Sequence, residues 1–127
     1  MSGATAPAAG GAVLREAIAQ ARRWYWQRIS AMVLALCVVI HLAGMVWAVR
    51  GGLSAAEILS RTQGNLLFAA FYAVFVLACA VHVPLGLETI AREWLGIPRK
   101  AGRALALGFA LLILVMGLRA IYGVVAR

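Results

Sequence analysis

The sequence has few of the residues that keep a folded chain soluble. Only 13% of its 127 residues are charged, four of them acidic, and it contains two histidines, two cysteines and three prolines. Hydrophobic residues make up 65%, which is more apolar surface than a soluble domain of this length could bury. Both cysteines lie in apolar segments and suggest small buried side chains rather than a disulfide. We find no repeat, phosphate-binding loop, clustered Cys/His motif or nucleophile arrangement.

The hydrophobic residues are concentrated in three segments, about 29–49, 66–87 and 104–125. Each has about the 20 residues that an α-helix needs to cross a ~30 Å hydrocarbon layer. We therefore predict an all-α membrane protein with three transmembrane helices in a single domain over residues 12–127. A short amphipathic helix is expected over 12–26, ahead of the first span. Residues 1–11 are small and unpatterned, and are expected to form a disordered tail.

Local signals predict how the spans are connected. Ser54 and Glu57 form a capping box that should begin a short surface helix in the first loop. Gly96-Ile97-Pro98 should end the helix that extends from the second span. Gly108 and Gly117 in the third span permit close helix contact.

The net charge of +8 could indicate a nucleic-acid partner, but the positions of the basic residues argue against one. Eight precede the first span or lie between the second and third, whereas three lie in the other loop or at the C-terminus. The eight are Arg15, Arg22, Arg23, Arg28, Arg92, Arg99, Lys100 and Arg103; the three are Arg50, Arg61 and Arg127. By the positive-inside rule, the N-terminus and the 88–103 loop are expected in the cytoplasm. We expect a bacterial inner membrane in preference to the mitochondrial inner membrane.

His41 and His82 are the only histidines, and each lies within a predicted span. Ionisable residues at membrane depth usually face the interior of a bundle as ligands, relays or polar contacts between helices. Small residues near both, among them Gly44, Cys79 and Gly86, leave room for a macrocycle. Haem ligation is therefore the first hypothesis, and an interhelical hydrogen bond from each histidine is the alternative.

The two histidines are expected at different depths. From an inner boundary near Ile29, His41 lies about 18 Å deep, whereas His82 lies about 8 Å from the same boundary near Leu87. Two imidazoles that share one haem iron must lie at similar depth, so His41 and His82 should not share one. Each then needs a histidine from another chain. We predict a dimer with a second three-span chain, the same or related, that holds two b-type haems.

Two motifs carry a resemblance to a known family. Gln27-Arg28-Ile29-Ser30-Ala31 looks like the second half of a Ser-x-x-His-Arg-x-Ser-Gly motif at the start of a first span. His82 and Gly86 match a haem-ligating His-x-x-x-Gly in a second span, with Glu88 where arginine is usual. Over about residues 24–125, the chain resembles the cytochrome b membrane anchors of succinate dehydrogenase and fumarate reductase (respiratory complex II).

The resemblance implies a non-catalytic anchor that passes electrons between cytoplasmic subunits and membrane quinone. Its expected partners are an iron–sulfur subunit and a flavoprotein subunit that acts on a C4 dicarboxylate, together with membrane lipid. His41 and His82 would be the haem iron ligands. In that family the first-span Arg and Ser lie near the quinone pocket or the haem propionates, which nominates Arg28 and Ser30.

Two other functions stay open. The chain could be the haem b anchor of a different respiratory dehydrogenase, although such anchors commonly use four spans and more histidines. It could also be a small haem-free transporter or an assembly subunit, with the histidines as relay or structural groups.

Overall fold

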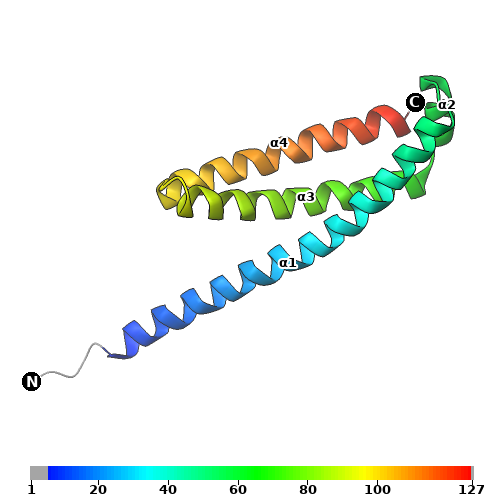
Figure 1. Cartoon of the computed structure of the whole chain (residues 1–127). Helices are drawn as coiled ribbons and strands as arrows, with labels where there is room; N and C mark the ends of the chain where they lie inside the picture. The colour runs from blue at the N-terminus through cyan, green and yellow to red at the C-terminus, as the bar shows by residue number, and fades with distance from the viewer. Residues whose placement is uncertain (1–5, 127) are drawn as a thin grey trace, which may run out of the picture.

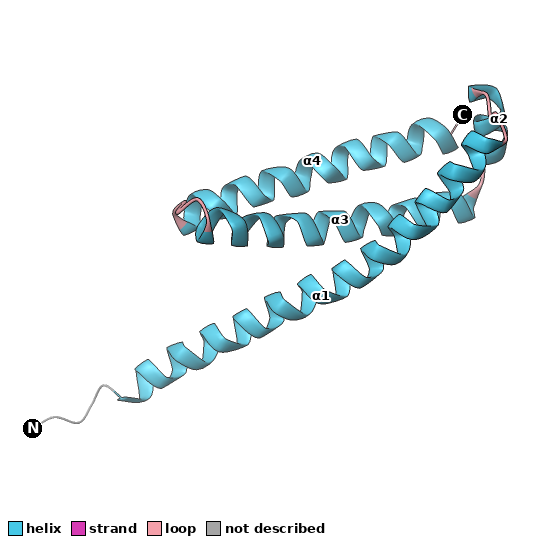
Figure 2. Cartoon of the chain, in the orientation of Figure 1, coloured by secondary structure: helices cyan, strands magenta, loops and turns pink. Residues whose placement is uncertain are grey.

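The chain folds into four α-helices in this computed structural model, which describes residues 6–126. The helices are α1 (Ala6–Arg50), α2 (Ala55–Thr62), α3 (Leu66–Glu93) and α4 (Arg99–Val125), and Figure 2 shows the loops that join them. α1, α3 and α4 are long and apolar enough to cross a membrane. The predicted all-α class and the three candidate spans are confirmed.

The N-terminal region differs from the prediction. A single helix, α1, runs from Ala6 through the first span, so there is no separate helix over 12–26 and residues 6–11 are not a disordered tail. Residues 1–5 of that expected tail lie outside the described residues. After Pro7 the segment is rich in alanine and arginine and has no further proline before the span; Gly10 and Gly11 are its only weak helix formers of the glycine or proline type. Residues of high helix propensity let the helix of the span continue back to the N-terminus.

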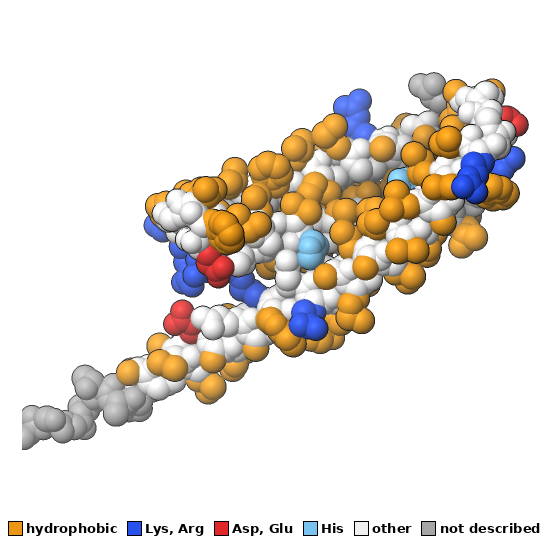
Figure 3. Space-filling model, in the orientation of Figure 1, with side chains coloured by type: hydrophobic (Ala, Val, Ile, Leu, Met, Phe, Trp, Pro, Cys, Tyr) orange, Lys and Arg blue, Asp and Glu red, His pale blue; other side chains and the backbone are white. Residues whose placement is uncertain are grey.

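The three long helices lie in a row with α3 in the middle (Figure 1). α3 packs against α4 along its length and against α1 on its other side. The α1 helix diverges from the α3–α4 pair toward its N-terminus. Buried apolar side chains are few and small, namely Cys37, Ala78, Ala91 and Ala106. Large apolar side chains cover the outside of the helices (Figure 3), as expected of surfaces that face lipid.

Close approach of α3 and α4 depends on Gly117. A Cβ atom at Gly117 would lie 2.6 and 2.7 Å from the two γ-methyl carbons of Val76. The predicted close contact is therefore confirmed for Gly117. At Gly108 a Cβ would meet nothing within 4 Å, so within the described chain this glycine makes no such contact.

The loop signals are confirmed. Ser54 caps α2, with its Oγ accepting from Glu57 N at 3.3 Å while its own N–H donates to Glu57 Oε2 at 3.2 Å. Gly96 has φ +62° in the loop after α3, a conformation that favours glycine. Thr62 Oγ1 donates to the carbonyl of Val124 at 2.8 Å, which ties the end of α2 to the end of α4.

Candidate cofactor site

The two histidines and the side chains that contact them lie along the interface between α1 and α3. Spacings of three, four and seven residues place one set on a single face of each helix. On α1 these are Arg23, Gln27, Ser30, Cys37 and His41; on α3 they are Tyr72, Phe75, Cys79, His82 and Gly86. Contacts between the two sets run from one end to the other, and we call this surface the α1–α3 interface.

His82 contacts Ser30, one of the other residues singled out in the sequence. Ser30 Oγ lies 3.4 Å from His82 Nδ1 and donates to the carbonyl of Gln27 at 3.1 Å. Ser30 is buried, whereas His82 is half-buried. The long Ser30–His82 distance makes this a weak hydrogen bond, but it fixes which ring nitrogen faces α1.

His41 is held more firmly, by a residue that the sequence analysis did not single out. Its Nδ1 lies 2.7 Å from the hydroxyl oxygen of Tyr72 on α3. The rings of Tyr72 and Phe75 meet the imidazole edge to face, with centroids 5.7 and 5.8 Å away. These contacts leave the ring little freedom to turn. Tyr72 lies ten residues before His82 on α3, or about 15 Å along the helix, so the depth difference of about 10 Å expected from the sequence did not place it opposite His41.

The two histidines share one arrangement. Each uses Nδ1 toward a hydroxyl group on the facing helix, and Nε2 of neither has a hydrogen-bond partner among the described residues. Histidine ligands of metals commonly donate one ring N–H to such a partner, which fixes the tautomer and orients the other nitrogen toward the metal. The arrangement therefore leaves Nε2 of each histidine able to bind a metal.

The histidines are farther apart in depth than the sequence indicated. Tyr72 lies opposite His41, and Ser30 lies opposite His82. Tyr72 and His82 are ten residues apart on α3, and Ser30 and His41 are eleven residues apart on α1. At 1.5 Å per residue, this is about 15 Å, compared with the 10 Å expected. The sequence estimate placed Ile29 and Leu87 at the same depth in the membrane. In the structure His82 lies opposite Ser30, so Leu87, farther along α3, lies beyond Ile29 toward the N-terminus of α1. One iron cannot bind both rings.

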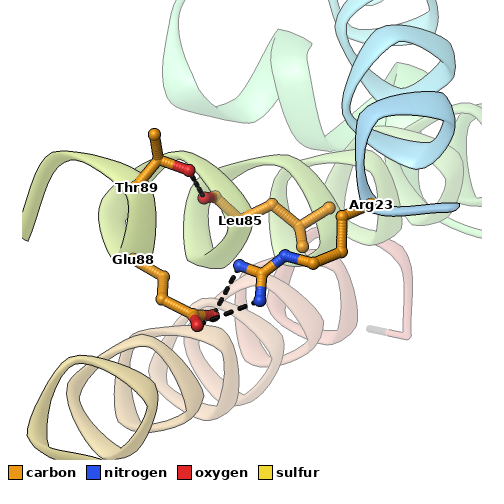
Figure 4. Close-up of polar contacts among 4 residues, drawn as sticks. All are labelled: Arg23, Leu85, Glu88 and Thr89. Atoms are coloured by element: carbon orange, nitrogen blue, oxygen red, sulfur yellow. Dashed lines mark hydrogen bonds and ion pairs between the residues drawn. The ribbon is translucent and has the colours of Figure 1, made fainter. Parts of the chain in front are cut away.

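An ion pair joins α1 and α3 at the end of the interface nearer His82 (Figure 4). The guanidinium of Arg23 binds the carboxylate of Glu88 through two contacts of 2.8 and 3.0 Å. Glu88 is 7% exposed and Arg23 only partly covered. Neither residue was nominated from the sequence as part of a site. Paired, fork-like geometry is the strongest arrangement available to these side chains, so the pair fixes α1 against α3 beside His82.

Arg28 and Ser30 do not come together. Ser30 lies in the α1–α3 interface, whereas Arg28 is exposed, and its guanidinium carbon lies 5.0 Å from the centroid of the Trp24 ring. Arg28 lines a pocket of about 570 Å³, which we call the basic-end pocket. Its walls are Gln20, Arg23, Trp24, Gln27, Arg28, Leu85, Gly86, Thr89 and Ile90.

An apolar hollow lies along another part of the interface. A pocket of about 390 Å³ and one of about 220 Å³ share Val33 and Val74 in their walls. Ser30 lines the smaller one but neither histidine lines either. No group of three or more His, Cys, Asp or Glu side chains that could hold a metal ion occurs within residues 6–126.

Comparison of the chain with models of known families, with curated proteins and with solved structures gave no match.

Proposed function

We propose that this chain is a haem b-binding membrane anchor that passes electrons between a cytoplasmic dehydrogenase and membrane quinone. The observation that supports it best is the matched state of the two histidines. Both are oriented through Nδ1 by a hydroxyl group and keep Nε2 available, at depths about 15 Å apart.

The residues present fit one half of each haem site. A b-type haem held by two histidines needs one from each side, and this chain offers a single histidine at each depth. A second three-span anchor chain, the same or related, would supply the opposite ligands. Bound haem would supply reversible one-electron chemistry, with a potential set by its ligands and their hydrogen bonds.

The chain's own residues have distinct roles in this proposal. Tyr72 and Ser30 orient His41 and His82, respectively, and the ion pair of Arg23 and Glu88 fixes the two helices beside His82. The lipid-facing apolar helices keep water from both histidines. The chain would bind and position without catalysing a reaction of its own.

The location follows from charge, and the partners are those that the resemblance to complex II anchors implies. With the basic end of the helices in the cytoplasm, as the positive-inside rule predicts, His82 lies nearer the cytoplasm and His41 nearer the outside of a bacterial inner membrane. An iron–sulfur subunit with its flavoprotein subunit, of the succinate dehydrogenase or fumarate reductase type, would then deliver or receive electrons at the His82 end. Arg28 and Ser30 as contacts of a haem propionate or quinone remain part of the sequence prediction.

A haem-free role is the second candidate, and one observation favours it. The contacts of His41 with Tyr72 and of His82 with Ser30 are interhelical hydrogen bonds, which in membranes contribute about 0.6 kcal/mol each. A small transporter or an assembly subunit could use them to hold α1 against α3, or to relay protons.

Purification of the tagged chain with its native partners separates these functions. The proposal expects a coloured protein with a Soret band and b-type α absorption, together with a flavin-bearing subunit that reacts with succinate. Co-purification of a molybdenum or nickel subunit would instead indicate another respiratory dehydrogenase. A colourless protein at full occupancy of partners would support the haem-free role.

A further inference from the structure

The basic-end pocket is a candidate binding site in its own right, although Arg28 in its wall is also the residue that the sequence prediction nominates as a haem propionate or quinone contact. It opens beside α1 and α3 at the end of the molecule where Arg15, Arg22, Arg23 and Arg28 lie. Trp24 in its wall is the type of residue that sits at the level of lipid headgroups. We propose that this pocket binds the headgroup of an anionic phospholipid that carries a free hydroxyl group, of the phosphatidylglycerol class.

The charge of the pocket suits a single phosphate. Two arginines line it, but Glu88 neutralises Arg23 through the paired contacts of 2.8 and 3.0 Å. Arg28 has no carboxylate within ion-pair distance among residues 8–126, and stacks on Trp24 instead. The unpaired guanidinium of Arg28, at the boundary between membrane and water, matches the single negative charge of a phosphodiester. It can donate charge-assisted hydrogen bonds to the phosphate oxygens.

The pocket also has an unused acceptor. Gln27 Oε1 is buried and has no hydrogen-bond partner in the described chain, which is rare and costly for a buried polar atom. The terminal torsion of glutamine is broad, so the amide can turn toward a ligand in the pocket at little cost. The neighbouring Thr89 hydroxyl donates its proton to the carbonyl of Leu85 at 3.0 Å (Figure 4), so it too can meet a ligand only as an acceptor.

The required donor should be uncharged. An ammonium group, as in phosphatidylethanolamine, would be placed close to Arg28 and would be repelled by it. A glycerol hydroxyl donates to Gln27 without that repulsion. Of the remaining wall residues, Leu85, Gly86 and Ile90 are apolar and suit the start of the acyl chains, whereas Gln20 is polar. Gly86 leaves space beside Gln27 in the pocket, because a Cβ atom at this position would lie 3.3 Å from Gln27 Nε2.

Lipid binding to the full chain in detergent micelles, counted by native mass spectrometry, tests the proposal. Phosphatidylglycerol is compared with zwitterionic phosphatidylcholine and with phosphatidic acid, which is anionic but lacks the headgroup glycerol. We expect phosphatidylglycerol to bind tightest. Arg28→Gln should weaken it by about tenfold, the loss typical of a charge-assisted contact. Gln27→Leu should abolish the preference over phosphatidic acid, and Gly86→Leu should block binding by filling the pocket.

Arg22→Gln is the matched control, because Arg22 is an exposed arginine of the same helix that does not line the pocket. It should leave phosphatidylglycerol binding unchanged. Equal weakening by Arg22→Gln and Arg28→Gln would overturn the proposal in favour of diffuse charge attraction. Equal binding of phosphatidylcholine, or competition by free glycerol phosphate at the affinity of the lipid, would overturn it too. Circular dichroism confirms that each variant keeps its helices, and Gly86→Leu gives an answer that does not depend on charge.

Discussion

His41 and Tyr72 join α1 to α3 through a contact of 2.7 Å between Nδ1 and the phenolic oxygen. If Nε2 binds iron, Nδ1 must carry the proton and donate it to Tyr72. This donation makes the imidazole a more basic ligand, which favours the ferric state.

Replacement of Tyr72 by phenylalanine should therefore raise the midpoint potential of the haem at His41. The proton on Nδ1 loses its acceptor, while the ring packing against Phe75 is kept. A redox titration followed at the α absorption should show one haem shifted upward by tens of millivolts, with haem content unchanged. An unaltered potential for both haems would mean that Tyr72 does not support an axial ligand.

Ser30→Ala should act on the other haem and more weakly. Its hydroxyl lies 3.4 Å from His82 Nδ1, a longer and weaker contact than that of Tyr72. In the same titration, the haem at His82 should move upward by less than the Tyr72→Phe shift. Because the two variants change different haems, their combination should give both shifts independently; a shift of the same haem in both would contradict the assignment by depth.

Loss of the ion pair between Arg23 and Glu88 should loosen α1 from α3. Glu88→Gln leaves the Arg23 guanidinium without its charged partner, and we expect a loss of about 1–2 kcal/mol in the free energy of unfolding. The partial exposure of Arg23 keeps the loss below that of a fully buried pair. Thermal unfolding in detergent measures it.

Glu16→Gln is the control for that measurement, because its contact with Arg99 is 4.0 Å long and exposed on both sides. It should change stability very little. If Glu88→Gln is as harmless as the control, the pair does not hold the helices together.

Gly117→Ala should separate α3 from α4. The added methyl carbon would overlap the γ-methyls of Val76 at 2.6 and 2.7 Å and approach its Cβ at 3.3 Å, so rotation of the valine cannot relieve the overlap. We expect a destabilisation of about 1–3 kcal/mol by thermal unfolding. Gly108→Ala, which meets nothing within 4 Å, should be neutral or slightly stabilising. A reversed order would show that α4 packs elsewhere.

The sequence was sufficient where the cause of a structure is local. Hydropathy over about 20 residues located the three candidate spans, and the hydrogen bonds of Ser54 and Glu57 determine the start of α2 whatever surrounds them. Local propensity also explains the one error in the fold. No proline lies between residues 8 and 28, and the alanine-rich and arginine-rich segment after Gly10-Gly11 favours a helix, so the predicted tail and separate helix became part of α1.

The contacts of the site depend on which faces meet, and hydropathy does not reveal that. Tyr72 in a span could equally have faced lipid, and Glu88 could have been read as a boundary charge. From the sequence we expected a depth difference of about 10 Å between the two histidines, whereas the contacts between α1 and α3 give about 15 Å. Side-chain contacts such as the Arg23–Glu88 pair join the two helices at this stagger, and hydropathy does not predict such contacts.

The most direct test of the haem assignment is a count of haem per chain from reduced-minus-oxidised spectra of the native protein and of His41→Ala and His82→Ala. Two haems per anchor dimer are expected in the native protein, and each substitution should remove a different one while the other keeps its spectrum. Colourless native protein would contradict the haem assignment. The loss of all haem absorption in either variant would contradict it too, because it would indicate one site shared by both histidines.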